Sequence, residues 1–282
     1  MRTLIFGAKG QLGRDLMTVF GDAGEVSGHD VDTVDIADRA AVERIVSEFN
    51  PELIVNAAAY TDVEAAEGNE AKAFAVNETG AGILAASAGA PVVYYSTDYV
   101  FGGTKTTPYL PDDAVDPIGV YARSKEAGER APRAANARHF IVRTAWLYGP
   151  GGNNFVEKIL RAASQRPSLR VVDDEVGSPT HTWDLALATR ALAATTAYGT
   201  YHAVNAGACS RYEFALAILE LAGLRTPVEP CSSAEFSTKA ERPLYSVLSN
   251  AKLERATRHA MRPWRDALAH YVKRRTARIQ ST

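Results

Sequence analysis

The sequence predicts an α/β fold whose core is a doubly wound parallel sheet with helices on both faces. In the first half of the chain, short apolar segments alternate with segments of helical spacing. The apolar segments contain consecutive Val, Ile and Leu residues, which is typical of parallel strands buried on both faces. The second half loses this regular alternation, so we expect a smaller C-terminal unit that is interleaved with the first.

Short connections separate the elements of the first half. We expect strands at 4–6, from 26, and at 53–59, 91–96 and 140–143, and helices at 11–20, 40–49, 70–87 and around 121–125. The helix at 40–49 stops at Asn50 and Pro51, because a residue that precedes proline disfavours helical geometry. The helix at 70–87 ends at Gly89, with Pro91 just beyond it, as is common at helix C-termini.

The second half mixes helices with shorter strands. We expect helices at 153–164, 183–194, 211–222 and 265–278, strands at 169–172 and 201–204, and a loop-rich stretch at 227–243. The last helix is rich in Arg, and we expect it to fray into a solvated end.

The composition is that of an ordinary globular protein, with 282 residues, 46% hydrophobic and 23% charged. A net charge of −2 gives no reason to expect nucleic acid or an anionic membrane as a partner. The two cysteines, Cys209 and Cys231, fit free thiols in a reducing compartment. No signal-peptide pattern or apolar run of about 18 residues is evident, so we expect a soluble, cytoplasmic protein without a membrane partner.

Three glycines between the first strand and the first helix predict a dinucleotide site. Gly7, Gly10 and Gly13 let the backbone turn tightly and approach a pyrophosphate, which then rests on the helix N-terminus. Their spacing is Gly-x-x-Gly-x-x-Gly, and Gln11 and Leu12 complete the loop. This placement, directly after a strand at the chain start, indicates a Rossmann-type sheet.

The end of the second strand should recognise the adenosine half of the dinucleotide. Asp30 stands about 20 residues after the glycine loop, where an acid binds the ribose diol and disfavours a 2′-phosphate. Lys9 would offset that repulsion, and Asp32 is an alternative ribose ligand. The other cofactor contacts expected here are Asp35, Ile36, Ala57, Ala58 and Ala59.

Tyr121 and Lys125 form a Tyr-x-x-x-Lys pair that shares one face of a helix. A free phenol has a pKa of about 10, too high for an efficient acid at neutral pH. A neighbouring cation favours the phenolate, so we expect Lys125 to lower the pKa of Tyr121 toward the working range. By itself this spacing is equally consistent with a Tyr and a solvated Lys on an ordinary surface helix.

Together with the glycine loop, this pair resembles the extended short-chain dehydrogenases/reductases. Further segments are similar to the dTDP-4-dehydrorhamnose reductase family within them. These segments are Asn56–Glu67, Tyr95–Phe101, Arg143–Gly149, Gly152–Phe155, Val172–Thr180 and Arg242–Leu248. They occur in order over nearly the whole chain, from residue 7 to about 268.

The resemblance implies reduction of the 4-keto group of a dTDP-6-deoxyhexulose with NADH or NADPH. Thr97 would donate a hydrogen bond to the substrate carbonyl, Tyr121 would give the proton, and Lys125 would bind the nicotinamide ribose. Thr61 and Ser96 complete the expected cofactor contacts. The substrate contacts that it implies are Val63, Thr97, Asp98, Trp146, Asn153, Asn154, Ser178 and Arg242.

The same resemblance implies two interleaved domains. Residues 1–150 and about 183–205 would form the NAD(P)-binding Rossmann domain, and about 151–182 and 206–282 the nucleotide-sugar substrate domain. Glu64, Glu175 and Tyr245 depart from the family pattern, and the last two leave the exact sugar open. The histidines, including His181 and His202, form no ligand cluster in the sequence, and we interpret them as structural.

We expect a monomer or homodimer and no metal in the chemistry. Some family members are bridged by Mg²⁺, and Asp15 falls at one such position, but a solvated Asp at a helix start is the simpler interpretation. Two other functions stay open: a related 4-ketoreductase for another deoxysugar or a dihydrostreptose-like sugar, and a non-catalytic subunit like the methionine adenosyltransferase beta subunit. An epimerase or dehydratase is disfavoured, because Thr97-Asp98 supplies no additional acid/base pair.

Overall fold

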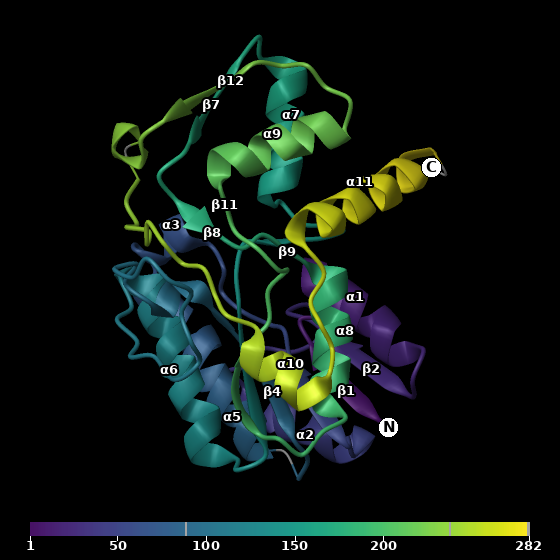
Figure 1. Ribbon diagram of the computed structural model, residues 1–282. Coiled ribbons are helices and arrows are strands. Elements are labelled where there is room, and N and C mark those ends of the chain that lie inside the picture. The colour runs from purple at the N-terminus through teal and green to yellow at the C-terminus, as the bar shows by residue number, and fades with distance from the viewer. Residues whose placement is uncertain (88, 237, 281–282) are drawn as a thin grey trace.

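A six-stranded parallel sheet forms the centre of the molecule (Figure 1). The computed structural model describes residues 1–87, 89–236 and 238–280. The strands are β1 (Thr3–Phe6), β2 (Val26–His29), β3 (Leu53–Asn56), β4 (Val92–Thr97), β5 (His139–Thr144) and β10 (Gly199–His202), in the order β10-β5-β4-β3-β1-β2. Because β2 and β3 pair with opposite sides of β1, the strand order reverses there. This confirms the predicted doubly wound α/β fold.

Helices cover both faces of the sheet. The helices on one face are α1 (Gln11–Gly21) and α8 (Thr182–Ala193), and those on the other are α2 (Arg39–Phe49), α5 (Ala81–Ser87) and α6 (Gly119–Ala135). Successive residues of a strand point to opposite faces. Ile5 therefore packs with Leu16 under α1, while its neighbours Leu4 and Phe6 pack with Val42 under α2.

The stretch predicted as one helix at 70–87 is interrupted by a wider turn. It consists of α4 (Glu70–Phe74), a π-helical segment η1 (Ala75–Gly80) and α5. Within η1, the Asn77 amide accepts from the Tyr60 backbone N–H at 2.9 Å and donates to the Ser124 hydroxyl at 2.9 Å. The π segment thus joins the chain that leaves β3 to helix α6, and π-helical turns often occur beside functional sites.

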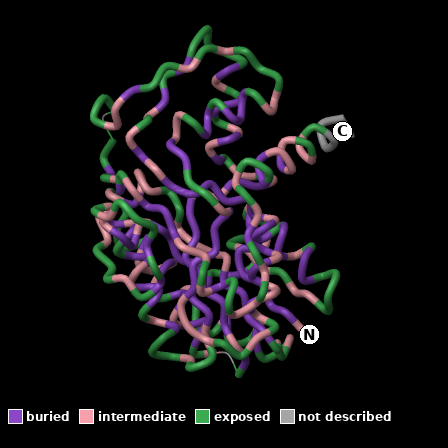
Figure 2. Tube along the Cα trace, viewed as in Figure 1, coloured by how far each residue is buried: buried purple, intermediate pink, exposed green. Residues whose placement is uncertain are grey.

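A second core lies above the carboxyl ends of the strands (Figure 1). It is built from α7 (Phe155–Gln165), α9 (Arg211–Leu221), α11 (Trp264–Gln280) and the parallel pair β7 (Leu169–Val172) and β12 (Val228–Cys231). Figure 2 shows buried residues inside this unit as well as in the sheet. By contrast, α10 (Ala251–Thr257) packs on α8 and β10, and Leu253 lies in the sheet core. The packing at 251–257 therefore departs from the expected inclusion of this stretch in the 206–282 unit.

Short elements connect the two cores above the sheet. They are α3 (Val63–Ala66), η2 (Asp98–Val100), β6 (Leu147–Tyr148) paired with β9 (Thr180–His181), β8 (Val176–Gly177) paired with β11 (Cys209–Ser210), and η3 (Ser233–Glu235). The helix expected from residue 153 begins at Phe155, because the Asn154 side chain caps it. In the described part of the chain, no helix is both long and apolar enough to cross a membrane.

Helix α6 packs closely on the sheet and on η1 at Gly128. A Cβ atom there would lie 2.0 Å from the Asn77 carbonyl oxygen and 2.1 Å from the Tyr94 hydroxyl. We predict that Gly128→Ala lowers the free energy of unfolding by about 1–3 kcal/mol, as overpacking does. At Gly82 a Cβ would make an ordinary 3.4 Å contact with Ala131, so Gly82→Ala is the matched control. Urea unfolding of both variants measures this, and equal stabilities would contradict the packing argument.

Candidate active site

A cavity of about 440 Å³ lies at the carboxyl ends of the strands, beside the point where the strand order reverses. Open parallel sheets bind their ligands at such a point. The cavity brings together side chains from the glycine loop, the end of β3, the end of β4 and helix α6. Its lining includes the expected residues Gly10, Gln11, Leu12, Gly13, Ala57, Ala58, Ala59, Thr61, Val63, Ser96, Thr97, Asp98, Tyr121, Lys125, Trp146, Asn153 and Asn154.

A second cavity of about 490 Å³ continues from the first on the other side of the glycine loop. It is lined by Gly7, Asp30, Asp35 and Ile36, and it shares Gly10 and Ala57–Ala59 with the first. The two cavities adjoin each other along the glycine loop, so together they form one extended site that suits a long ligand such as a dinucleotide.

The glycine loop packs so closely on itself and on the end of β3 that Gly7 and Gly13 have no room for a side chain. Gly7 has a φ of +82°, and a Cβ there would lie 2.5 Å from the Ala58 backbone nitrogen. A Cβ on Gly13 would lie 2.0 Å from the Gly7 carbonyl oxygen. Nearby, the buried amide nitrogen of Asn56 lines the first cavity without a hydrogen-bond partner in the described residues. A backbone cradle and an unused donor fit a bound dinucleotide.

The expected ribose ligand Asp30 is held by the loop itself. Its carboxylate accepts from the Lys9 backbone N–H at 2.7 Å and from the Val31 N–H at 2.8 Å. The Lys9 ammonium forms an ion pair with Asp32, which holds the pKa of that carboxyl below its ordinary value. Asp32 therefore engages the cation that was expected to offset the charge of Asp30. Of the two candidate ribose ligands, Asp30 lines the cavity and Asp32 is not among its lining residues.

Thr97 is the last residue of β4 and begins the turn η2. Its hydroxyl accepts from the Tyr99 backbone N–H at 3.2 Å and donates to the Asp98 carboxylate at 3.0 Å. Thr97 also interacts with the Tyr121 phenol, whose pKa it lowers. The structure therefore brings both expected hydroxyls together in one cavity.

Helix α6 carries Tyr121 and Lys125, and a buried ion pair positions it. Glu129, one turn beyond Lys125, accepts from the Arg143 guanidinium of β5 at 2.7 and 2.8 Å. Both side chains are at most 2% exposed. A two-point contact between fully buried partners fixes how α6 is rotated on the sheet.

The expectation that Lys125 lowers the pKa of Tyr121 is wrong for the protein by itself. Burial raises the pKa of Tyr121 above its ordinary value, and the nearby Asp98 and Tyr99 add to this, while the interaction with Thr97 opposes it. The Lys125 ammonium lies 4.3 Å from the centroid of the Tyr94 ring. Burial also lowers the pKa of Lys125 to about 7, against the effect of Glu129, so its charge is only partly present at neutral pH.

Asp98 is a buried carboxyl next to Thr97. Burial raises its pKa to about 6, while hydrogen bonds from Ser246 and Thr97 and the charge of Arg211 act in the opposite direction. The Ser246 hydroxyl donates to it at 2.6 Å. Since Ser246 comes from the chain after the loop-rich stretch, Asp98 ties that distant segment to the active site.

Trp146 lies in the cavity in a strained backbone conformation. Its φ of 45° is uncommon for a bulky residue and costs about 1–3 kcal/mol. The Arg211 guanidinium lies 3.4 Å from the centroid of its ring, and a Cβ on Gly177 would lie 2.6 Å from Trp146 Cε2. Arg211 and the bare backbone of Gly177 thus hold the indole in place. Arg211 was not expected from the sequence, where it is only the first residue of a predicted helix.

The other residues expected to contact the substrate lie in three different places: the active-site cavity, the protein interior and a third cavity. Asn153 and Asn154 line the cavity, and the Asn154 amide also donates to the Gly149 carbonyl at 3.0 Å. Ser178 is fully buried, donates to the Gly207 carbonyl at 2.9 Å and is not among the residues that line these cavities, so its role as a substrate contact stays a prediction. Arg242 lines a third cavity, of about 670 Å³, and forms an ion pair with Glu64 at 2.5 Å.

Asp15 is not the solvated residue that was expected. It is 2% exposed, the Thr182 hydroxyl donates to it at 2.6 Å, and Arg274 lies 4.0 Å away. Among the described residues, no group of three or more His, Cys, Asp and Glu side chains could hold a metal ion. The alternative of an Mg²⁺ bound at Asp15 therefore gains no support.

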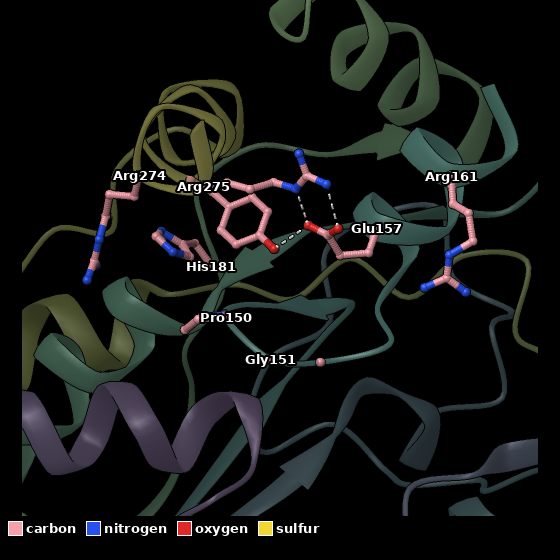
Figure 3. Close-up of a pocket in the computed structure, with 9 residues that line it drawn as sticks. Pro150, Gly151, Glu157, Arg161, His181, Arg274 and Arg275 are labelled. Carbon is pink, nitrogen blue, oxygen red and sulfur yellow. Dashed lines mark hydrogen bonds and ion pairs between the residues drawn. The ribbon is translucent and has the colours of Figure 1, made fainter. Parts of the chain in front are cut away.

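A further cavity, of about 310 Å³, is lined by the 150–152 loop and by side chains of α7 and α11 (Figure 3). At its edge, Glu157 of α7 accepts from Arg275 at 2.7 and 3.0 Å and from the Tyr271 hydroxyl at 2.8 Å. Figure 3 shows the Arg275 side chain of α11 reaching toward Glu157. The contacts join α7 to α11 and so stabilise the wall that carries Asn153 and Asn154.

An open parallel sheet with a glycine loop at its reversal point, and with Thr, Tyr and Lys in the same cavity, defines an enzyme of the short-chain dehydrogenase/reductase type. Comparison with known families agrees. The chain belongs to the family described as the RmlD substrate binding domain, whose model matches residues 1–277.

Related proteins cover nearly the full chain. Spore coat polysaccharide biosynthesis protein SpsK of Bacillus subtilis is 42% identical over 98% of this chain and 98% of its own. The dTDP-4-dehydrorhamnose reductase of Mycobacterium tuberculosis is 44% identical over 95% of this chain and 91% of its own. The crystal structure of dTDP-4-dehydrorhamnose reductase from Bacillus anthracis, in complex with NADP, has a TM-score of 0.94 and 38% identity, with 97% and 99% covered.

The lowered pKa of Lys125 has a consequence for stability. Between about pH 7 and 10.5 the folded protein has released this proton and the unfolded chain still binds it. The free energy of unfolding should therefore rise with pH across this window. Lys125→Met lacks this titrating group. We therefore predict that the free energy of unfolding of the native protein rises relative to that of Lys125→Met as pH increases from 7 to 10. Urea unfolding at several pH values measures it, and a difference that does not change with pH would refute the shift.

Proposed function

We propose that this protein reduces the 4-keto group of a dTDP-6-deoxy-L-hexulose, converting dTDP-4-dehydrorhamnose to dTDP-L-rhamnose with NADH or NADPH. The observation that carries the proposal is the meeting of Thr97 and Tyr121 in one cavity beside the glycine loop. The relatives named dTDP-4-dehydrorhamnose reductase support the substrate class, and the NADP complex of one of them supports the cofactor.

The cofactor would span the two joined cavities. Asp30, Asp35 and Ile36 would contact the adenosine half, and the glycine loop would approach the pyrophosphate. Thr61, Ser96 and Lys125 would contact the nicotinamide half in the first cavity. A reduced nicotinamide bound there supplies the hydride for the carbonyl carbon.

Thr97 and Tyr121 would act together on the carbonyl oxygen of the substrate. Both hydroxyls can donate hydrogen bonds to the negative charge that develops there during reduction. Tyr121 would then give its proton to the oxygen and be reprotonated from solvent. Its raised pKa means that it is protonated before the reaction at neutral pH, as a proton donor must be.

The sugar would lie between the catalytic hydroxyls and Trp146, with Val63 and Asp98 beside it. The rest of the substrate would extend toward Arg242 in the third cavity. In this arrangement residues 1–150 and about 183–205 act as the dinucleotide domain. Residues of about 151–182 and 206–282 act as the substrate domain, except that α10 packs back on the sheet.

A related 4-ketoreductase is the second candidate. The relative SpsK is named for spore coat polysaccharide biosynthesis, and the resemblance to the reductase family is incomplete at Glu175 and Tyr245. Such an enzyme would use the same chemistry on another deoxysugar. A purely regulatory subunit would have no need for Thr97, Tyr121 and Lys125 in one cavity.

The loss of reduced-nicotinamide absorbance with dTDP-4-keto-6-deoxy-L-lyxo-hexulose tests the reaction. We predict rapid oxidation by the native protein and a loss of about 10²–10⁴-fold in Tyr121→Phe, because one proton donor is removed. Tyr99→Phe removes a neighbouring hydroxyl of the same cavity and should lose far less. If Tyr121→Phe turns over normally, the proton comes from another group.

Cofactor preference should depend on Asp30. An acid at the ribose repels a 2′-phosphate, so Asp30→Ala should raise the ratio of kcat/KM for NADPH to that for NADH by about tenfold or more. Asp32→Ala in a Lys9→Met background is the matched control, because it removes the neighbouring acid without releasing a cation and leaves Asp30 in place. A ratio that moves with Asp32→Ala and not with Asp30→Ala would transfer the ribose role to Asp32.

A further inference from the structure

Arg211 stands where the active-site cavity meets the third cavity. The first holds the catalytic hydroxyls, and the third lies between α7, β7 and the 233–242 segment. Of the residues that line these two cavities in the described chain, Arg211 is common to both. A ligand with its sugar in one cavity and its base in the other must therefore pass this side chain.

Contacts on several sides hold the Arg211 side chain in place. The guanidinium lies 3.4 Å from the centroid of the Trp146 ring and 5.5 Å from that of Phe155. Its Nε donates to the Glu175 carboxylate at 3.2 Å, and the Arg211 backbone N–H donates to the Glu175 carbonyl at 3.2 Å. Within the described residues, the two terminal nitrogens make no hydrogen bond. A fixed guanidinium with free terminal donors is arranged to bind a phosphate in a fork.

The charges around Arg211 also favour an anion. The third cavity is lined by Lys158, Arg170, Arg211 and Arg242 against the carboxylates Glu175 and Glu241. Arg170 and Arg242 are occupied by ion pairs with Glu235 and Glu64. Arg211 differs from them in its position, because it also borders the cavity of Thr97 and Tyr121.

We propose that Arg211 binds the diphosphate of the nucleotide-sugar substrate, with the sugar against Trp146 and the base in the third cavity. This rests on the proposed function and adds a residue that positions the substrate. Phosphate oxygens would take the free terminal donors, while the stacking on Trp146 couples diphosphate binding to the face that contacts the sugar. Arg242 then has a supporting role, because Glu64 holds its guanidinium.

Calorimetric titration with dTDP and with thymidine isolates the diphosphate contribution. In Arg211→Gln, the Kd of dTDP should rise at least tenfold, while that of thymidine changes less than twofold. Arg211→Lys keeps the charge but loses the forked pair of donors, so its Kd for dTDP should lie between those of the native protein and Arg211→Gln. Arg170→Gln removes an exposed cation from the same cavity and should change dTDP binding less than threefold. Glu175→Gln removes the competing carboxylate and should leave dTDP binding equal or tighter.

The outcomes separate the possible failures. If Arg211 only supports Trp146, dTDP and thymidine will weaken equally in Arg211→Gln, and the proposal is overturned. It is overturned as well if Arg170→Gln weakens dTDP as much, since the effect would then be general charge. If the native protein reduces the keto-sugar but Arg211→Gln binds dTDP as tightly as the native protein does, the role of Arg211 is refuted and the proposed function stands. A native protein that neither reduces it nor binds dTDP refutes the proposed function and this inference together.

Discussion

The buried ion pair between Arg143 and Glu129 is the contact on which the active site depends most directly. It joins β5 to α6 with two hydrogen bonds, and both side chains are buried. Removing Glu129 would leave the Arg143 guanidinium as an uncompensated buried charge, at a cost of about 3–5 kcal/mol. Because Tyr121, Lys125 and Glu129 are spaced four residues apart on α6, the rotation that satisfies Glu129 also turns the other two toward the sheet end. The second partner, Arg143, reaches the Pro111 carbonyl at 3.0 Å and thereby fixes the loop before α6.

Burial has the same effect on three ionisable groups of the cavity, Asp98, Lys125 and Tyr121. The pKa of Asp98 is raised to about 6, that of Lys125 is lowered to about 7, and that of Tyr121 is raised. In each of these groups the neutral form is stabilised relative to the charged form, because the buried surroundings solvate charge poorly. A cavity that resists charge before the substrate arrives makes the hydroxyl donors and the cationic side chains more effective when negative charge develops.

Two segments from the second half complete a cavity that the sheet only begins. Ser246 contacts Asp98, and Arg211 covers Trp146, so both reach the active site from beyond residue 200. The absence of a side chain at Gly177 leaves room for the Trp146 indole. The strained φ of Trp146 persists because Arg211 and Gly177 contact its ring from different elements, which one stretch of sequence could not arrange.

The sequence by itself determined the parallel sheet, the glycine loop and the family, because these depend on local spacing and on residue types that only a few folds require. It also placed Thr97, Tyr121 and Lys125 correctly in one cavity, since each follows directly from a strand end or a helical turn. Only the tertiary structure decided the direction of the pKa shifts, the burial of Asp15 and Ser178, and the position of Arg211. These depend on which distant side chains exclude water from a group, and such neighbours leave no periodic pattern in the chain.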